Sequence, residues 1–323
     1  MKKENLRIVY LGTPDFAVAP LRALVEGGYR VVGVITMPDK PMGKHQSEPQ
    51  PSPVKQYALS AGLPILQPDS LKDERFLDEL RSWQADLQIV VAFRMLPRLV
   101  WEMPPMGTFN IHASLLPQYR GAAPINWAII NGETQTGITT FFLKHEIDTG
   151  EVIRQQPIAI GETENAGSLH DRLMKLGAEM VVETVDAILA GEARPIAQET
   201  MTAATESLKP APKLFKENCR IDWDRPVDEV YNFIRGLAPY PGAWTELTTP
   251  AGDRSITLKI FETERIRQPH SLTAGTMVSD GKTHLDIAAR DGLIRLKIFQ
   301  QTGKKRMTAE EYLRGNNRLF QLK

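Results

Sequence analysis

Apolar residues in the first half of the chain follow two kinds of pattern. Short, nearly continuous apolar runs are typical of parallel strands covered on both faces, and they occupy 6–12, 31–36, 63–66 and 87–93. Between these runs, apolar residues recur with helical spacing up to Glu26, over 54–61 and over 71–83. This repeated strand–helix order predicts an α/β fold with a twisted, mostly parallel sheet and helices on both of its faces.

The second half of the chain has a different pattern. After the polar, proline-containing segment 191–212, a short helix is predicted near 226–236, followed by short alternating runs between Gly, Asp and Pro turns. Such runs predict a small antiparallel barrel of ~100 residues. We therefore predict a first domain over 1–190, an interdomain linker over 191–212 and a second domain over 213–323.

One stretch, from Gly107 to Pro124, combines a strand with polar side chains. It reads GTFNIHASLLPQYRGAAP, and alternation along its first half places Asn110, His112 and Ser114 on one face. Since an unpaired buried polar group costs about 1–3 kcal/mol, these side chains are either hydrogen-bonded or line a site. The strand ends before Pro117, so its polar face reaches the carboxyl edge, where open α/β sheets bind ligands.

Two strands, a turn and a long helix follow this stretch. Residues 137–160 predict strands on either side of a turn at 148–150, and a helix is predicted over 167–190. Because Asp and Gly are common turn residues, the pattern alone describes Asp148 as part of a turn.

Earlier in the chain, the polar segment 37–53 holds five prolines and predicts a long loop that is either functional or disordered.

Composition narrows the class of protein. Hydrophobic residues make up 42% of the chain and charged residues 24%, as in ordinary globular proteins. No apolar run approaches the ~18–20 residues that cross a bilayer, and the first residues lack the apolar core of a signal peptide, so we expect a cytoplasmic protein without a membrane partner. The single cysteine, Cys219, excludes an internal disulfide and a cysteine-rich zinc cluster.

The formal net charge of zero conceals an asymmetry between two parts of the chain. Residues 1–206 hold 19 Lys and Arg against 25 Asp and Glu, a net charge of −6, whereas residues 207–323 hold 20 against 14, a net charge of +6. A basic second part fits a polyanion partner. Two differently charged solvated surfaces would give the same numbers.

Three motifs together resemble the signature of the formyltransferases that use 10-formyltetrahydrofolate. They are NIHASLLP at 110–117, RGAAPI at 120–125 and DTG at 148–150. The resemblance implies a Rossmann-like, mostly parallel sheet domain followed by a small OB-like β-barrel domain. It also implies 10-formyltetrahydrofolate as co-substrate and no metal.

The same resemblance implies roles for individual residues. Asn110, His112 and Asp148 would form the catalytic set. Asn110 and a protonated His112 would donate hydrogen bonds to an oxyanion, while Asp148 would orient His112 and help to move a proton. The residues implied to contact the folate are Ser114, Leu115, Leu116, Pro117 and Phe93.

Further segments resemble the branch of this family whose acceptor is methionyl-initiator tRNA. They are GTPDFA at 12–17, PSPVK at 51–55, IDW at 221–223 and APYPGAW at 238–244. The implied reaction is formyl transfer to the α-amino group of methionyl-initiator tRNA, by a protein that we expect to be a monomer. The core motif also fits enzymes that formylate sugar nucleotides with the same donor, which is the alternative function. The residues expected to contact tRNA are Lys40, Lys44, Arg120, Lys304, Lys305 and Arg306.

Two segments depart from the family pattern. The segment usually written Ala-Tyr/Phe-Gly-x-Ile-Leu-Pro is AFRMLP at 92–97, one residue shorter and with Arg94 in place of a glycine. The loop 37–53, often rich in Arg and Lys, holds only Lys40, Lys44 and His45. The resemblance implies that the segment 92–97 forms a wall of the folate site and that the loop 37–53 contacts the acceptor stem of the tRNA.

Overall fold

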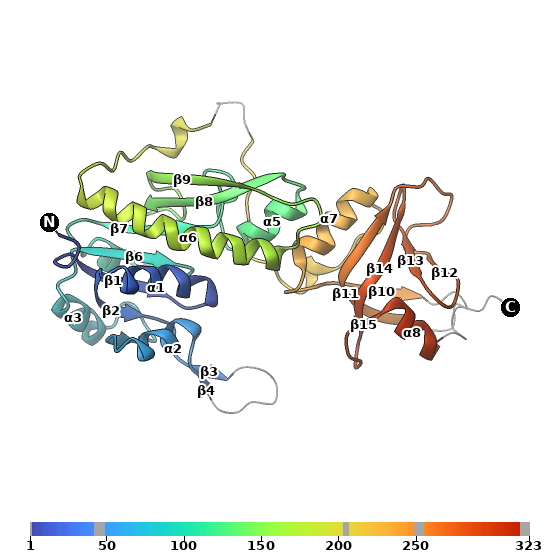
Figure 1. Ribbon diagram of the computed structural model, residues 1–323, viewed down its shortest axis with the longest axis horizontal. Coiled ribbons are helices and arrows are strands. Elements are labelled where there is room, and N and C mark those ends of the chain that lie inside the picture. Colours follow the sequence, from blue (N-terminus) through green and yellow to red (C-terminus); the bar gives the residue numbers. More distant parts are fainter. Residues whose placement is uncertain (1, 42–48, 203–206, 249–254, 317–323) are drawn as a thin grey trace. The chain divides into compact units, whose positions relative to one another are not determined.

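The computed structural model describes residues 2–41, 49–202, 207–248 and 255–316 (Figure 1). The chain divides into two compact units. Unit 1 comprises Met1–Gly121, Thr136–Ile158 and His170–Pro210, and unit 2 comprises Ala122–Gln135, Ala159–Leu169 and Ala211–Lys323. These units are interleaved along the chain, whereas the predicted domains follow one another; the predicted boundaries at 190 and 213 stay a prediction.

Unit 1 is built on a seven-stranded sheet with the strand order β5-β2-β1-β6-β7-β8-β9. Neighbouring strands from β5 to β7 are parallel, and β8 runs antiparallel to β7. This arrangement confirms the predicted mostly parallel, Rossmann-like sheet. The strands are β1 (Arg7–Gly12), β2 (Arg30–Ile35), β5 (Ile65–Leu66), β6 (Leu87–Val91), β7 (Thr108–His112), β8 (Gln135–Phe142) and β9 (Val152–Ala159).

Helices cover both faces of this sheet, as the strand–helix order predicted. On one face, α3 and α4 pack in a single apolar cluster with Val9 of β1 and Val90 of β6. On the other face lies α6, where a Cβ on Gly177 would be 3.8 Å from Ile111 of β7. The short helices α4 and η2 are absent from the prediction because so few residues carry no clear periodicity. The helices are η1 (Asp15–Ala17), α1 (Val18–Glu26), α2 (Pro53–Ser60), α3 (Glu74–Ser82), α4 (Arg98–Trp101), α6 (Ala166–Leu189) and η2 (Gln198–Thr200).

The predicted loop 37–53 contains a short hairpin of β3 (Lys40–Pro41) and β4 (Pro49–Gln50). Its base is fixed by Asp39, whose carboxylate accepts hydrogen bonds from Lys55 Nζ at 2.5 Å and from Gln67 Nε2 at 2.8 Å. These hydrogen bonds, first that from Lys55, hold the pKa of Asp39 below its ordinary value. Residues 42–48, which include the predicted contact Lys44, lie outside the described residues.

Unit 2 contains a curled antiparallel sheet with the strand order β10-β11-β14-β13-β12, and β15 pairs with β14 (Figure 1). This sheet confirms the predicted small antiparallel domain. The strands are β10 (Ala243–Thr248), β11 (Ser255–Ile266), β12 (Met277–Ser279), β13 (Leu285–Ala288), β14 (Leu293–Gln301) and β15 (Met307–Thr308). The helices of unit 2 are α5 (Pro124–Ile130), η3 (Glu217–Cys219), α7 (Val227–Leu237) and α8 (Ala309–Asn316).

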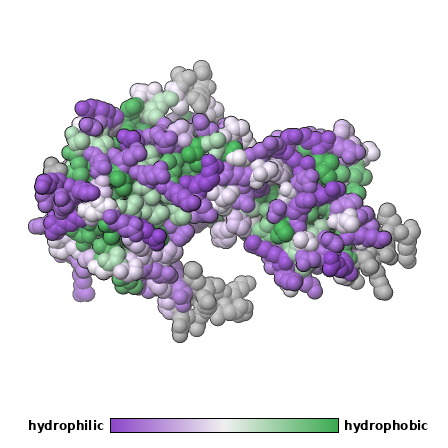
Figure 2. Space-filling model, viewed as in Figure 1, coloured by the Kyte–Doolittle hydropathy of each residue, from purple (hydrophilic) through white to green (hydrophobic). Residues whose placement is uncertain are grey.

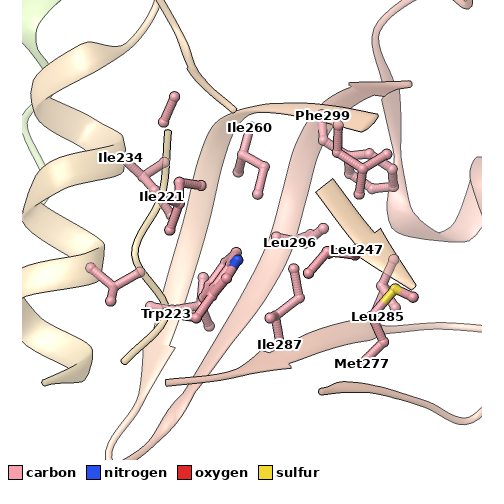
Figure 3. Close-up of a cluster of buried hydrophobic side chains, with 14 of the residues drawn as sticks. Ile221, Trp223, Ile234, Leu247, Ile260, Met277, Leu285, Ile287, Leu296 and Phe299 are labelled. Atoms are coloured by element: carbon pink, nitrogen blue, oxygen red, sulfur yellow. The ribbon is translucent and has the colours of Figure 1, made fainter. Parts of the chain in front are cut away.

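The core of unit 2 is formed by side chains that converge from several strands and from the IDW segment (Figure 3). Trp223 of that segment is buried, and its Nε1 donates a hydrogen bond to Thr245 Oγ1 at 2.9 Å, so the one polar atom of the indole is satisfied. The helix α8, which the sequence analysis does not predict, places Tyr312 edge-on against Phe299, with 5.2 Å between ring centroids. The basic C-terminal part of the chain therefore has an ordinary apolar interior.

The surface is mixed in polarity. On the face drawn in Figure 2, hydrophobic residues form separate groups among hydrophilic ones. Met95 and Leu99, which flank the start of α4, are among the most exposed large apolar side chains of unit 1. Within the described ranges, no helix combines the length and the apolar character that a membrane span requires.

Two leucines of unit 2 test the assignment of its core. Leu258 is fully buried in β11, so Leu258→Ala should lower the free energy of unfolding by about 2–5 kcal/mol. Leu272 is 41% exposed, and Leu272→Ala should change it by about 0.5 kcal/mol or less. Urea unfolding of both variants measures the difference, and equal losses would contradict the assigned core.

Candidate active site

Three parallel strands end together at the edge that the sequence analysis singled out. In the strand register, Gly12 of β1 pairs with Val91 of β6, and Val91 pairs with Ile111 of β7. The segments that follow these strands therefore begin at one level of the sheet. These are the segments that carry GTPDFA, AFRMLP and ASLLP, so the fold brings the three motifs to one edge.

Asn110 and His112 share one face of β7 and lie beside β8. The antiparallel register pairs Asn110 with Phe141 and His112 with Thr139. The His112 ring lies edge-on to Phe141, with 6.5 Å between centroids, and only 6% of the residue is exposed. Asn110 is half-buried, and its side-chain amide has no hydrogen-bond partner among the described residues. An amide donor is therefore free at this edge, next to a buried imidazole.

A backbone carbonyl fixes the orientation of His112. The ring atom Nε2 lies 2.9 Å from the Tyr119 carbonyl oxygen. Because a carbonyl oxygen only accepts, Nε2 must carry the hydrogen. The other ring nitrogen, Nδ1, lies 3.9 Å from Oδ2 of Asp148, which is an ion-pair distance when the ring is charged but too long for a hydrogen bond. Asp148 therefore faces the imidazole, while Tyr119 makes the direct bond to it.

The turn that carries Asp148 explains the DTG motif. Asp148 has a φ of +55°, in the left-handed region that Asp tolerates better than most residues, and its Oδ2 accepts a hydrogen bond from Gly121 N at 2.9 Å. A Cβ on Gly150 would lie 1.6 Å from the Phe142 carbonyl oxygen, so only glycine fits there. The close approach of the Phe142 carbonyl thus requires glycine at position 150, and the left-handed backbone at position 148 suits Asp.

The segment Ser114–Pro117 is tied down by Thr139 and Gln155. Ser114 is fully buried, and its hydroxyl donates to the Gln118 carbonyl at 2.7 Å. Thr139 Oγ1 donates to the Ser114 carbonyl at 2.6 Å, and Gln155 Nε2 donates to the Leu116 carbonyl at 2.6 Å. Leu116 and Pro117 are buried as well, and Leu115 is half-buried. The folate contacts expected of this segment stay a prediction, and Leu115 is its most accessible member.

The segment after β6 is fastened by the residue that departs from the family pattern. Phe93 is half-buried and packs against the apolar cluster under α3. The Arg94 guanidinium donates to the Pro68 carbonyl at 2.5 Å and to the Asp69 carbonyl at 2.8 Å. The side chain that stands in place of a glycine therefore links this segment to the one after β5. The folate contact expected of Phe93 stays a prediction.

The residues expected to contact tRNA have different environments. Lys40 is exposed on β3 in unit 1, whereas the Arg120 guanidinium is half-buried and donates to Gln198 Oε1 at 3.0 and 2.7 Å. In unit 2, Lys304, Lys305 and Arg306 are exposed, and the Arg306 guanidinium lies 3.7 Å from the centroid of the Phe261 ring. Arg120 is thus occupied by a protein contact, while the three cations of unit 2 face solvent.

Several residues of this site carry no signal in the sequence. Tyr119 holds His112 through its backbone, so its side-chain type gives no indication of that role. Thr139 lies in a predicted strand and Gln198 in the predicted linker. A single sequence does not show which distant segments their side chains bind. Within the described ranges, no group of three or more His, Cys, Asp or Glu side chains is placed to hold a metal ion.

Two family descriptions match the chain. The family described as Formyl transferase matches residues 6–185, and the one described as Formyl transferase, C-terminal domain, matches residues 213–317. A protein from Bacteroides fragilis named methionyl-tRNA formyltransferase is 63% identical over 98% of this chain and 96% of its own length. The chain belongs to the methionyl-tRNA formyltransferase family. Proteins of the same name from Parabacteroides distasonis and Porphyromonas gingivalis are 60% and 56% identical, each over 98% of this chain and 97% of its own length.

Solved structures outside the methionyl-tRNA formyltransferase family share the fold. HypX from Aquifex aeolicus in complex with tetrahydrofolic acid matches 96% of this chain, with a TM-score of 0.62 and 18% identity. The match covers 47% of the HypX chain, so this chain spans about half the length of HypX. WlaRD, a sugar 3N-formyl transferase, matches 93% of this chain and 99% of its own, with a TM-score of 0.63 and 20% identity. At these identities the likeness shows the fold alone.

Two glycines of unit 1 test how tightly the Asp148 turn is built. Gly150→Ala should lower the free energy of unfolding by about 2–3 kcal/mol, because the new methyl group would clash with the Phe142 carbonyl. Gly177→Ala adds the same methyl group to α6 at ordinary contact distance, and should raise stability by about 0.5–1 kcal/mol. Denaturant unfolding of the pair is the measurement. An unchanged free energy of unfolding in Gly150→Ala would contradict the close contact between position 150 and the Phe142 carbonyl.

Proposed function

We propose that this chain transfers the formyl group of 10-formyltetrahydrofolate to the α-amino group of methionyl-initiator tRNA, giving N-formylmethionyl-tRNA for translation initiation. The observation that carries the proposal is the near-full-length identity of 56–63% to proteins named methionyl-tRNA formyltransferase. The arrangement of Asn110, His112 and Asp148 at one sheet edge supports it, because this set suits acyl transfer to an amine. We further propose that the protein works in the cytoplasm as a monomer.

The chemistry assigns a task to each of the three side chains. The methionyl amine attacks the formyl carbon, the carbonyl oxygen becomes an oxyanion, and the bond from carbon to the folate N10 then breaks. Asn110 donates its free amide N–H to the oxyanion, and each such preorganised donor is typically worth ~10²–10³ in rate. The proton lost by the amine must reach the departing folate nitrogen, so a proton carrier is needed as well.

His112 and Asp148 supply the second donor and the proton carrier. Since Nε2 is bound to the Tyr119 carbonyl, Nδ1 is the ring atom that meets the substrate, and in the charged ring Nδ1–H is the second oxyanion donor. Asp148, 3.9 Å from Nδ1, stabilises that charge, takes up the proton of the attacking amine and passes it to the departing folate N10. The half-buried Phe93 and Leu115 offer apolar surface for the folate ring system at the same edge.

The acceptor decides between the leading function and its alternative. An amino-sugar nucleotide would use the same donor and catalytic set, and would need no basic surface on unit 2. Incubation with 10-formyltetrahydrofolate and either charged initiator tRNA or an amino-sugar nucleotide compares them directly. Formylmethionine on the tRNA, and no formylated sugar, is the expected outcome, and the reverse would replace the proposed acceptor.

Single substitutions of the oxyanion donors test the chemistry. Asn110→Ala and His112→Ala should each lower kcat by about 10²-fold or more, because the lost bonds act on the transition state. The Kd for tRNA should stay within a few-fold of the parent value. A His112→Ala enzyme with near-parental turnover in the tRNA assay would remove His112 from the catalytic set.

The basic cluster of Lys304, Lys305 and Arg306 tests the tRNA surface. Replacing all three with Ala should raise the Kd for tRNA and flatten its log-log salt dependence by about two units, since each phosphate contact releases counterions. Folate binding should not change. The control is Ala at three arginines paired with carboxylates in unit 2, namely Arg225, Arg267 and Arg290.

The control removes the same charge from a different part of the unit. An equal loss of affinity in both triple variants would assign the effect to net charge rather than to the cluster. Parental affinity and salt slope in the Lys304–Arg306 variant would show that the cluster is not part of the tRNA surface.

A further inference from the structure

Gln198, in the segment predicted as an interdomain linker, is fully buried in unit 1. Its Nε2 donates to the carbonyl oxygens of Asp148 and Gly150, each at 2.8 Å. Its Oε1 accepts from Nε and Nη2 of Arg120, at 3.0 and 2.7 Å. An amide side chain has two N–H donors and one oxygen with two lone pairs, so these four bonds use its whole capacity.

The two segments that Gln198 joins are the ones that hold the catalytic set in place. Asp148 and Gly150 form the turn that presents the carboxylate. Arg120 lies between Tyr119, whose carbonyl binds His112, and Gly121, whose N–H binds the Asp148 carboxylate. A single buried amide therefore ties the turn of Asp148 to the segment that orients His112.

The backbone around Gln198 is itself anchored. Ile196 exchanges two backbone hydrogen bonds with Val152 at the start of β9, at 2.8 and 2.9 Å. Farther along the same segment, the Lys209 carbonyl accepts from Tyr119 N at 2.7 Å. The backbone that carries Gln198 is thus held in place by hydrogen bonds, so its side-chain amide is already positioned before substrate binds. A solvated linker would not have these bonds.

We propose that Gln198 is a positioning residue for the transfer reaction, which fixes the Asp148 carboxylate opposite Nδ1 of His112. Its bond to the Asp148 carbonyl holds that residue in the left-handed conformation, which costs about 1–3 kcal/mol for a residue other than glycine. Without it, the turn relaxes and the carboxylate moves relative to the imidazole. This inference rests on the proposed function, because it assigns Gln198 a task in that reaction.

Two substitutions distinguish the hydrogen bonds that Gln198 donates to the Asp148 turn from those that it accepts from Arg120. Gln198→Met keeps the approximate size and removes all four bonds, whereas Gln198→Glu keeps an acceptor for Arg120 and removes both donors to the turn. Both should lower kcat by about 10- to 100-fold, since displacements of about 1 Å in an active site have effects of this size. In Gln198→Glu, which keeps the contact with Arg120, the KM values for 10-formyltetrahydrofolate and for tRNA should stay within about three-fold.

A matched control distinguishes positioning from stability. Tyr29→Phe removes a part-buried 2.5 Å hydrogen bond to Asp186 elsewhere in unit 1, so it should lower the melting temperature while kcat stays within about two-fold. Gln198→Glu, in which Arg120 and the new carboxylate form an ion pair, serves if Gln198→Met does not fold. Parental kcat in folded Gln198→Glu would overturn the proposal.

A double-mutant cycle with Asp148→Ala tests the route of the effect. If Gln198 acts through Asp148, Gln198→Glu should change kcat by only about two-fold or less once Asp148 is gone, because the two effects are not additive. Full additivity would assign Gln198 a purely structural role and overturn the proposal. Failure of the parent enzyme to formylate tRNA would instead overturn the proposed function, so the two failures are distinguishable.

Discussion

The site depends on one buried hydrogen bond, from Nε2 of His112 to the Tyr119 carbonyl oxygen. The imidazole has almost no access to water, so this bond is what satisfies Nε2, and losing it would leave a buried donor unpaired. It also decides which nitrogen remains for chemistry. Because Nε2 is committed to the backbone, only Nδ1 can meet a substrate, and Asp148 lies opposite that atom.

The fold provides this bond by bringing distant segments to one sheet edge. Parallel β6 and β7 end at the same level. Antiparallel β8 begins beside the end of β7 and ends beside its start, and the loop that follows β8 brings the Asp148 carboxylate to 3.9 Å from the His112 ring. Buried polar side chains then join the segments. Thr139 binds the backbone of Ser114, and Gln198 binds that of Asp148. The side chains of His112 and Asp148 are thus held by hydrogen bonds with Tyr119 and Gly121, whereas the amide of Asn110 has no partner among the described residues and is left for the proposed oxyanion contact.

Much of this arrangement follows from local patterns. Period-two alternation predicted that Asn110 and His112 share a face, and strand–helix repetition predicted the mostly parallel sheet, because both patterns reflect burial of side chains near in sequence. The pairing of His112 with Tyr119 and the role of Gln198 could not be predicted in this way. The contact with Tyr119 uses a backbone carbonyl, which every residue has. Gln198 binds a residue 50 positions away in the sequence, and nothing in its residue type distinguishes it from a solvated glutamine of a linker. The helix α8 was missed because only Ala309, Tyr312 and Leu313 of it are buried, which is too few apolar positions to show a helical period.

The protonation of His112 is the measurement that tests this account most directly. Nitrogen NMR of histidine-labelled protein, with the His112 signal assigned from a His112→Gln variant, distinguishes the two neutral forms of the ring. The account predicts that the neutral ring carries its hydrogen on Nε2, as a single slowly exchanging form bound to a carbonyl. A hydrogen on Nδ1, or an average over both nitrogens, would contradict it, because Nδ1 would then not be the atom that is left for the substrate.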